Sequence, residues 1–93
     1  MKKLLFIDDD IDFLESNRLY FSKKQYTVFC ADKAKQALSF LTSTSVDCII
    51  LDIDMPNMNG FEVCQKIRNV SATPIIFLSG FADSKNRIAS FQP

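Results

Sequence analysis

The chain has 93 residues and equal numbers of basic and acidic side chains, 11 of each, so its formal net charge is zero. This length fits one small domain spanning residues 1–93, and the balanced charge argues against direct nucleic-acid binding through a basic face. No apolar run approaches the ~20 residues that a membrane-spanning helix needs, so we expect no membrane insertion.

Histidine is absent, and three cysteines lie in apolar surroundings at Cys30, Cys48 and Cys64. Their spacing fits no zinc motif, and without histidine the Ser-His and Cys-His nucleophile pairs are excluded. Free, buried thiols are typical of a reducing compartment, which predicts a cytoplasmic protein. Any chemistry must therefore use carboxylates, hydroxyls, lysines or a metal ion.

Strands and helices alternate along the predicted chain. In chain order, the expected strands are 3–7, 26–30, 46–51 and 75–78, and the expected helices are 11–25, 34–41, 60–68 and 84–91. The strands are apolar runs, and the clearest helices repeat apolar residues at three- and four-residue spacing. Asp10, Asp32 and Asn59 stand where side-chain caps of the first three helices are expected.

This alternation predicts an α/β protein with a doubly wound, parallel sheet and helices on both of its faces, joined by right-handed crossovers. With the strand order 2-1-3-4, the first and third strands are neighbours at the switch point of the sheet. The run 46–51, which is apolar apart from Asp47, suits a strand that is buried on both faces. In the third helix, Phe61, Cys64 and Ile67 are expected to face inward.

Polar residues follow three of the predicted strands at their carboxyl ends. Asp8 and Asp9 follow the first strand, Asp52 the third and Ser79 the fourth. Since open α/β sheets bind ligands at this edge, the three aspartates are expected to converge. Carboxylates that share one cleft repel one another, and a hard cation such as Mg²⁺ relieves that repulsion. Each residue alone has an ordinary explanation as a cap or a turn, but their joint placement suits phosphoryl transfer.

Three segments of the chain resemble the response-regulator receiver domain of two-component signalling. They are Leu5-Phe6-Ile7-Asp8-Asp9-Asp10, Asp52-Ile53-Asp54-Met55-Pro56-Asn57-Met58-Asn59-Gly60 and Thr73-Pro74-Ile75-Ile76-Phe77-Leu78-Ser79-Gly80. The likeness runs from about residue 2 to the end of the sequence. It implies a flavodoxin-like receiver fold and a signalling role, not that of an enzyme.

By this resemblance, Asp52 is the phospho-acceptor, which takes a phosphoryl group from a sensor histidine kinase or a phosphotransfer protein. Asp8, Asp9 and Asp52, with the backbone carbonyl of Asp54, would hold Mg²⁺. Ser79 would be the hydroxyl that turns toward the phosphoryl oxygens. Phosphorylation adds about −1.5 to −2 charges and three acceptor oxygens, so it can bias a loop with two states.

The family continues with a fifth strand, which carries a lysine just before a proline, and with a fifth helix. Neither is expected within these 93 residues, so the resemblance implies a receiver domain truncated before the fifth strand. The fourth strand, 75–78, would then be an uncovered apolar edge, and such edges pair with other chains. We therefore expect a homodimer through this edge, or a swapped element.

Two alternative functions stay open. Asp52-Ile53-Asp54 after an apolar strand also resembles the first motif of haloacid-dehalogenase-type phosphatases, in which the first aspartate is the nucleophile and the second a general acid/base. Pro56 stands where that family has Thr or Val, and Asp8 and Asp9 have no role in such an enzyme. The second alternative is a receiver-like interaction module that binds its partner without being phosphorylated.

Overall fold

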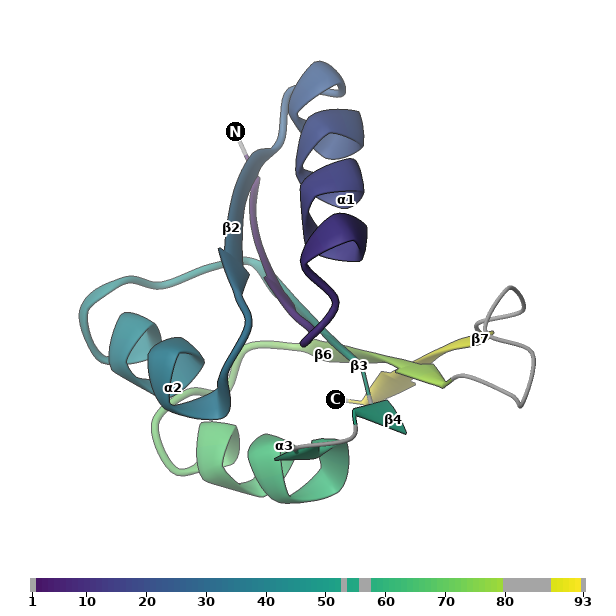
Figure 1. Ribbon diagram of the computed structural model, residues 1–93. Coiled ribbons are helices and arrows are strands. Elements are labelled where there is room, and N and C mark those ends of the chain that lie inside the picture. The colour runs from purple at the N-terminus through teal and green to yellow at the C-terminus, as the bar shows by residue number, and fades with distance from the viewer. Residues whose placement is uncertain (1, 53, 56–57, 80–87, 93) are drawn as a thin grey trace.

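The structure, a computed structural model, describes residues 2–52, 54–55, 58–79 and 88–92. Within these ranges it contains a five-stranded sheet, a two-stranded hairpin and three helices (Figure 1). In chain order the elements are β1 (Lys3–Ile7), α1 (Ile11–Lys23), β2 (Thr27–Ala31), α2 (Ala34–Ser43), β3 (Cys48–Asp52), β4 (Asp54–Met55), β5 (Met58–Asn59), α3 (Gly60–Arg68), β6 (Ile75–Ser79) and β7 (Ile88–Gln92). No helix in the described ranges is long and apolar enough to cross a membrane.

Four strands of the main sheet are parallel, and their order is β2-β1-β3-β6. This confirms the order 2-1-3-4 expected from the sequence, with β6 as the fourth predicted strand. β1 is paired on both sides: its register aligns Ile7 with Ala31 of β2 and with Leu51 of β3. The carboxyl ends of β1 and β3 therefore lie side by side.

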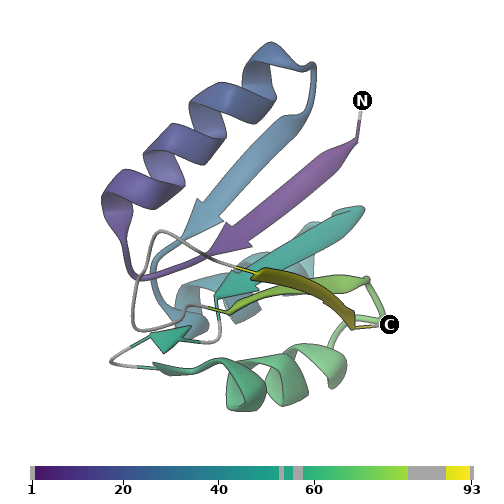
Figure 2. The same ribbon diagram turned by 90° about the vertical axis from the view of Figure 1, so that its right-hand side faces the viewer.

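Helices lie on both faces of the sheet, α2 and α3 on one face and α1 on the other (Figures 1 and 2). The α2–α3 side holds the larger apolar core, in which Ile49, Leu51 and Ile75 have no exposed surface. The core under α1 is smaller and includes Phe6 and Leu14. The doubly wound α/β fold predicted from the alternation of elements is confirmed.

α1 begins where the sequence indicates. The carboxylate of Asp10 accepts a hydrogen bond from the backbone N–H of Phe13 at 3.1 Å and so caps the helix. The helix ends at Lys23, two residues earlier than expected, and Gln25 follows in a left-handed conformation with φ of 67°. Glycine is usual just after a helix because other residues are strained there.

α2 does not begin with the expected cap. Lys33 precedes the helix and makes no side-chain capping bond. Asp32 lies one residue too early for that role, and its backbone N–H donates instead to Oε1 of Gln36 at 3.0 Å. The prediction that Asp32 caps α2 is therefore wrong, although the helix itself was expected.

α3 begins as expected, because the side chain of Asn59 accepts a hydrogen bond from the N–H of Phe61 at 2.9 Å. The prediction that Phe61 faces inward is wrong, since 58% of its surface is exposed. The buried face is formed by Gly60, Val63, Cys64 and Ile67. Phe61, in the first turn, thus lies at the margin of the core.

The last described segment contradicts the sequence-based expectation. Spacing predicts a helix over 84–91, but Ile88–Gln92 form strand β7, and residues 84–87 lie outside the described ranges. β7 runs antiparallel beside β6, with Gln92 aligned with Ile75. Spacing does not distinguish helix from strand in a run this short, and the backbone groups along β6 favour a strand as partner.

β7 also covers the edge of β6 through which we expected two copies of the chain to pair. The outer edge of β6 is not exposed, because β7 pairs along it. The main sheet therefore has five strands, and the prediction of an uncovered fourth-strand edge is wrong. A homodimer formed through that edge, or a swapped element that covers it, loses its structural basis.

Candidate functional site

Three carboxylates meet at the carboxyl ends of β1 and β3. Asp8 and Asp9 follow β1 directly, and Asp52 is the last residue of β3. One carboxylate oxygen from each lies within 4.8 Å of those from the other two. The predicted convergence is therefore confirmed, and its cause is the parallel register, which ends both strands at the same edge. We call this group the carboxylate cluster.

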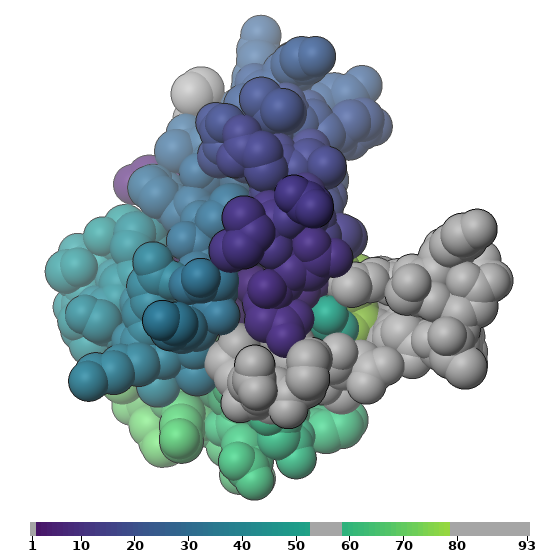
Figure 3. All heavy atoms as spheres, viewed as in Figure 1, coloured from purple at the N-terminus to yellow at the C-terminus, as the bar shows by residue number. Residues whose placement is uncertain are grey.

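The carboxylate cluster lies on the α1 side of the sheet. Side chains alternate between the faces of a strand, so Asp52 shares its face with Ile50. The N–H of Asp8 donates to the carbonyl of Ala31 at 3.1 Å, which continues the β1–β2 pairing by one residue. Asp8 therefore follows Phe6 on the face that packs under α1. Figure 3 shows the purple start of α1 directly beside a small teal surface, the colour of residues near 50.

Burial makes this arrangement unfavourable for carboxylates without a cation. Asp8 and Asp52 are only 1% and 2% exposed, and Asp9 is partly exposed. Desolvation, followed by the neighbouring charge of Asp8, raises the pKa of Asp9 above its ordinary value. The cluster thus concentrates negative charge where little water screens it, and a bound cation would stabilise it strongly.

The donor set fits a hard divalent cation. All three side chains of the cluster offer carboxylate oxygens, which Mg²⁺ prefers. Mg²⁺ holds its ligands at about 2.1 Å, so ligands on opposite sides of the ion are about 4.2 Å apart. Oxygens that lie within 4.8 Å of one another are close to that span. The residues match Mg²⁺ in type and in spacing.

For two other predicted site residues, Asp54 and Ser79, the structure describes the backbone but not the side chain. Asp54 begins β4, which pairs with β5 so that Asp54 is aligned with Asn59. Ser79 ends β6, one position beyond Leu78, which is aligned with Asp52. The backbone of Ser79 thus reaches the edge that holds the carboxylate cluster. Its side chain lies outside the described part of the chain, and the roles of both residues stay predictions.

Sequence reasoning missed the backbone group that orients Asp8. The N–H of Asp10 donates to Oδ1 of Asp8 at 3.0 Å. Aspartate commonly accepts such a bond from the backbone two residues ahead, where it stabilises a turn. The run of three aspartates between a strand and a helix was the available signal. It predicts this turn as well as the cap that Asp10 provides.

The sequence matches the response regulator receiver domain family over residues 4–93. The chain belongs to this family. The receiver domain has the motifs, the strand order and the carboxylate placement that the resemblance implied. The match does not support the alternative of a haloacid-dehalogenase-type phosphatase fragment.

Regulators from several bacteria are similar in sequence to this receiver domain. Regulatory protein VanR of Enterococcus faecium is 40% identical over 78 residues, which are 84% of this chain and 34% of VanR. Transcriptional regulatory protein ResD of Bacillus subtilis is 33% identical over 90 residues, which are 97% of this chain and 38% of ResD. The chain therefore spans little more than a third of the length of these relatives.

Solved response regulators share its fold. TrrA of Thermotoga maritima in complex with Mg²⁺ and BeF has a TM-score of 0.77 at 31% identity, and the match covers 88% of this chain and 72% of that one. A structure of histidine kinase ThkA in complex with TrrA matches with a TM-score of 0.78 at 30% identity, over 92% and 75% of the two chains. These likenesses confirm the flavodoxin-like receiver fold.

Proposed function

We propose that this receiver domain accepts a phosphoryl group on Asp52 and so relays a two-component signal. The observation that carries the proposal is the meeting of Asp52 with Asp8 and Asp9 at one edge of the sheet. Buried like charges from two strands destabilise a fold, so their presence favours a functional explanation. The family match and the fold support the same role.

The transfer we propose needs an ionised Asp52. One of its carboxylate oxygens attacks the phosphorus of a phosphohistidine, an O–P bond forms as the P–N bond breaks, and the histidine nitrogen keeps the electron pair. Because Asp52 is 2% exposed, few water molecules compete with the phosphoryl donor for its oxygens. Asp8, Asp9, Asp52 and the carbonyl of Asp54 would hold Mg²⁺, and the bound cation offsets the charge of the phosphoryl oxygens.

Ser79 would respond to the phosphoryl group on Asp52. Its backbone ends β6 next to the edge where Asp52 lies, so a hydroxyl there can donate to a phosphoryl oxygen after transfer. Before transfer that bond cannot form. A group that gains a partner in only one state shifts the balance between two conformations of its loop.

A sensor histidine kinase or a phosphotransfer protein would supply the phosphoryl group. The fold likeness to TrrA, which forms a complex with histidine kinase ThkA, supports such a partner. We infer a cytoplasmic signalling domain over residues 1–93 that neither turns over a substrate nor contacts nucleic acid directly. The output of the whole regulator would lie in segments of the kind that make its relatives longer.

The direct test is labelling with acetyl phosphate in Mg²⁺, followed by intact-mass measurement. We expect one phosphoryl group per chain in the wild type and none in Asp52→Asn. Asp47→Asn is the matched control, because Asp47 lies at the other end of the strands, where it accepts from the N–H of Lys3 at 2.7 Å. Labelling that persists in Asp52→Asn contradicts the proposal, and so does sustained hydrolysis of a phosphate ester.

The same variant separates a phosphorylated switch from a passive interaction module. If phosphorylation drives partner binding, Asp52→Asn removes the dependence of that binding on phosphoryl donor. A module that never uses phosphorylation would bind its partner equally well in both forms, with or without the donor. That outcome would replace the proposed function by the second alternative.

A further inference from the structure

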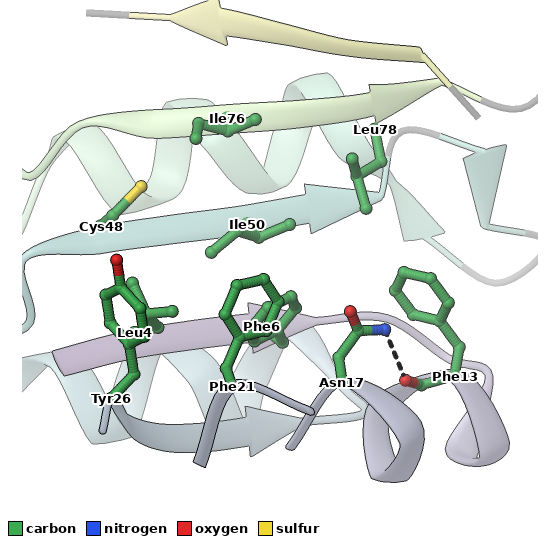
Figure 4. A pocket seen from close by; sticks show the side chains of 10 residues that line it. All are labelled: Leu4, Phe6, Phe13, Asn17, Phe21, Tyr26, Cys48, Ile50, Ile76 and Leu78. Atoms are coloured by element: carbon green, nitrogen blue, oxygen red, sulfur yellow. Dashed lines mark hydrogen bonds between the residues drawn. The ribbon is translucent and has the colours of Figure 1, made fainter. Parts of the chain in front are cut away.

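Two hollows lie beside α1, on different sides of the helix. The larger, of about 390 Å³, lies between α1 and the strands β3 and β6, and Figure 4 shows side chains of these elements along its walls. We call it the α1-side groove; its lining includes Asn17, Ile50 and Ile76. The groove borders β6, and the receiver family continues with a strand beside this one, so the openness of the groove does not indicate a ligand.

β2 forms the opposite edge of the sheet (Figures 1 and 2). Within the described ranges only β1 pairs with β2. The fifth strand of the family lies beside the fourth, in the order 2-1-3-4-5, so β2 is an edge whether or not that strand follows. Its five residues keep an unbroken register with β1 and include no charged residue and no proline. Edge strands usually carry such features, which keep other strands away, and β2 is therefore open to pairing.

Four backbone groups of β2 point away from the sheet. The N–H of Thr27 donates to the carbonyl of Lys2 at 2.9 Å, so Thr27 and every second residue after it face β1. The N–H and C=O groups of Val28 and Cys30 therefore point outward. Among the described residues none is bonded to these groups. They form a row that a further strand can pair with.

The second hollow beside α1, of about 250 Å³, lies next to this row. We call it the β2-edge hollow. Sγ of Cys30 donates to the carbonyl of Leu14 at 3.8 Å, so the side chain of Cys30 lies under α1. Ile11, Leu14 and Cys30 are the apolar residues that line the hollow. Its polar lining consists of Asp32, Gln36 and the ion pair between Glu15 and Arg18.

An added antiparallel strand would use both features. Two of its residues, opposite Val28 and Cys30, exchange two hydrogen bonds with each of them, which satisfies all four outward groups. Residues that lie directly opposite each other in a sheet point to the same face. The side chain opposite Cys30 would therefore point to the α1 face, where the β2-edge hollow has room for one aliphatic side chain. In such complexes main-chain bonds supply affinity and side-chain pockets supply selectivity.

The amino end of β2 is mainly basic and the carboxyl end mainly acidic. The basic residues at the amino end are Lys2, Lys23 and Lys24, and the acidic residues at the carboxyl end are Asp9, Asp10 and Asp32. Two charges reduce this polarity: Asp47 lies at the amino end, but beside β3, and Lys33 follows Asp32. A bound strand with a basic residue toward Asp32 and an acidic residue toward Lys24 complements both ends.

A second copy of this chain does not fit the edge. α1 packs mainly over β2. Two copies paired antiparallel through β2 would place both α1 helices on the same face, above adjacent strands that are about 4.8 Å apart. Packed helices need about 8–10 Å between their axes. A strand without a helix above it avoids this clash.

We propose that the edge of β2 binds an extended segment of a different polypeptide as an added antiparallel strand. This segment places an aliphatic side chain opposite Cys30, in the β2-edge hollow. It carries a basic residue toward Asp32 and an acidic residue toward Lys24. The bonds that it makes to β2 involve only the backbone of Val28 and Cys30.

A capped synthetic peptide with the order Lys-Thr-Leu-Thr-Val-Thr-Glu tests the proposal. In the antiparallel register its leucine lies opposite Cys30 and its valine opposite Val28. In spectra of the isotope-labelled chain, the amide signals of Val28 and Cys30 should shift more than that of Phe29, whose N–H faces β1. The amides of Val28 and Cys30 should also exchange with solvent faster than that of Phe29 in the free chain, and slow down with peptide. No shift at about 1 mM peptide, or full protection in the free chain, overturns the proposal.

N-methylated peptides give the matched control. Methyl groups on the leucine and valine nitrogens remove the two N–H groups that donate to β2, and should weaken binding on the order of tenfold or more. Methyl groups on the two threonines that flank the valine remove N–H groups that point away from β2, and should leave binding nearly unchanged. Equal effects of the two modifications contradict strand addition.

A variant of β2 tests the same bonds from the other side. Val28→Pro removes an outward N–H, whereas the bonds to β1 stay, and edge strands tolerate proline at such positions. It should weaken peptide binding on the order of tenfold, and Val28→Thr should not. Binding that survives Val28→Pro in folded protein contradicts the assignment; if this variant does not fold, the methylated peptides decide.

Discussion

The two faces of one sheet are packed differently in this receiver domain. On the α2–α3 face, Ile49, Leu51 and Ile75 are completely buried under two helices. On the α1 face, the alternate residues of the same strands are half-buried beside a groove, and the strand β3 ends there in the buried carboxylate of Asp52. Strand composition does not cause the difference, because both faces of β3 are apolar up to Asp52.

Under the proposed function, the best-packed core and the phospho-accepting site would lie on opposite sides of the sheet. The α2–α3 face, which we call the closed face, buries apolar side chains, which have no polar groups that need partners. This burial favours the folded state. On the α1 face, which we call the open face, the charges of the carboxylate cluster repel one another and the groove is incompletely packed. Regions with few buried apolar contacts open at lower free energy than the core. The α1 face is therefore expected to open at a lower free energy than the α2–α3 face.

Matched truncations on the two faces of β3 should show this difference most strongly. Ile49→Ala removes a fully buried side chain and should lower the free energy of unfolding by about 3 kcal/mol. Ile50→Ala removes a half-buried one at the edge of the groove and should cost about 1 kcal/mol. Urea unfolding of the two variants, followed by circular dichroism, measures both values.

The pair controls for position and chemistry, because the residues are identical and adjacent in one strand. Equal losses from Ile49→Ala and Ile50→Ala would show that the α1 face is as tightly packed as the other, and would remove the distinction between the faces. A larger loss from Ile50→Ala than from Ile49→Ala would mean that the α1 face is the more tightly packed of the two.

Mg²⁺ should stabilise the open face through the carboxylate cluster. A ligand that binds only the folded state at tenfold its dissociation constant adds about 1.4 kcal/mol to the free energy of unfolding. We expect a rise in melting temperature of the wild type with MgCl₂ and little rise in Asp52→Asn, at constant ionic strength. Asp47→Asn keeps the cluster intact and should respond like the wild type. An equal response in all three proteins would mean that the cation acts elsewhere.

Gln25→Gly should stabilise α1, the helix that covers the open face. Gln25 is held at φ of 67°, where a side chain is strained and glycine is not. Removing this strain should raise the free energy of unfolding by about 0.5–1 kcal/mol, less than the loss in Ile49→Ala. Gln25→Ala keeps the strain and is the control. A gain in both variants would point to the loss of the Gln25 side chain instead of the backbone conformation.

The fold was predictable where short-range signals and topology agree. Apolar runs placed the four parallel strands, alternation with helices predicted a doubly wound sheet, and the order 2-1-3-4 that we took for such a sheet is the one observed. Because that order makes β1 and β3 neighbours, it also predicted that Asp8, Asp9 and Asp52 meet. The left-handed conformation of Gln25 was not predicted, because the helix was expected to run through residue 25.

The errors arose where tertiary context decides. Residues 88–91 have no local signal that separates helix from strand, and the backbone groups along β6 favoured pairing with β7. Phe61 has helical spacing to the buried face, but it occupies the first turn of α3 at the margin of the core. The groove on the α1 face was also invisible in the sequence, since it depends on which strands each helix covers.

The carboxylate cluster should also make the free energy of unfolding depend on pH, and this effect should be smaller than those above. Burial and Asp8 raise the pKa of Asp9 in the folded state, so the unfolded chain releases this proton at a lower pH than the folded chain does. Between those two pKa values the folded state binds more protons, and stability falls as pH rises through this window. The stabilising contribution is therefore fully present below the ordinary Asp pKa of about 3.9 and is lost above the folded pKa.

Asp9→Asn should remove this loss, whereas Asp47→Asn should keep it, in unfolding curves recorded without Mg²⁺. A pH profile of Asp9→Asn that matches the wild type would show that repulsion in the carboxylate cluster does not limit the stability of the α1 face.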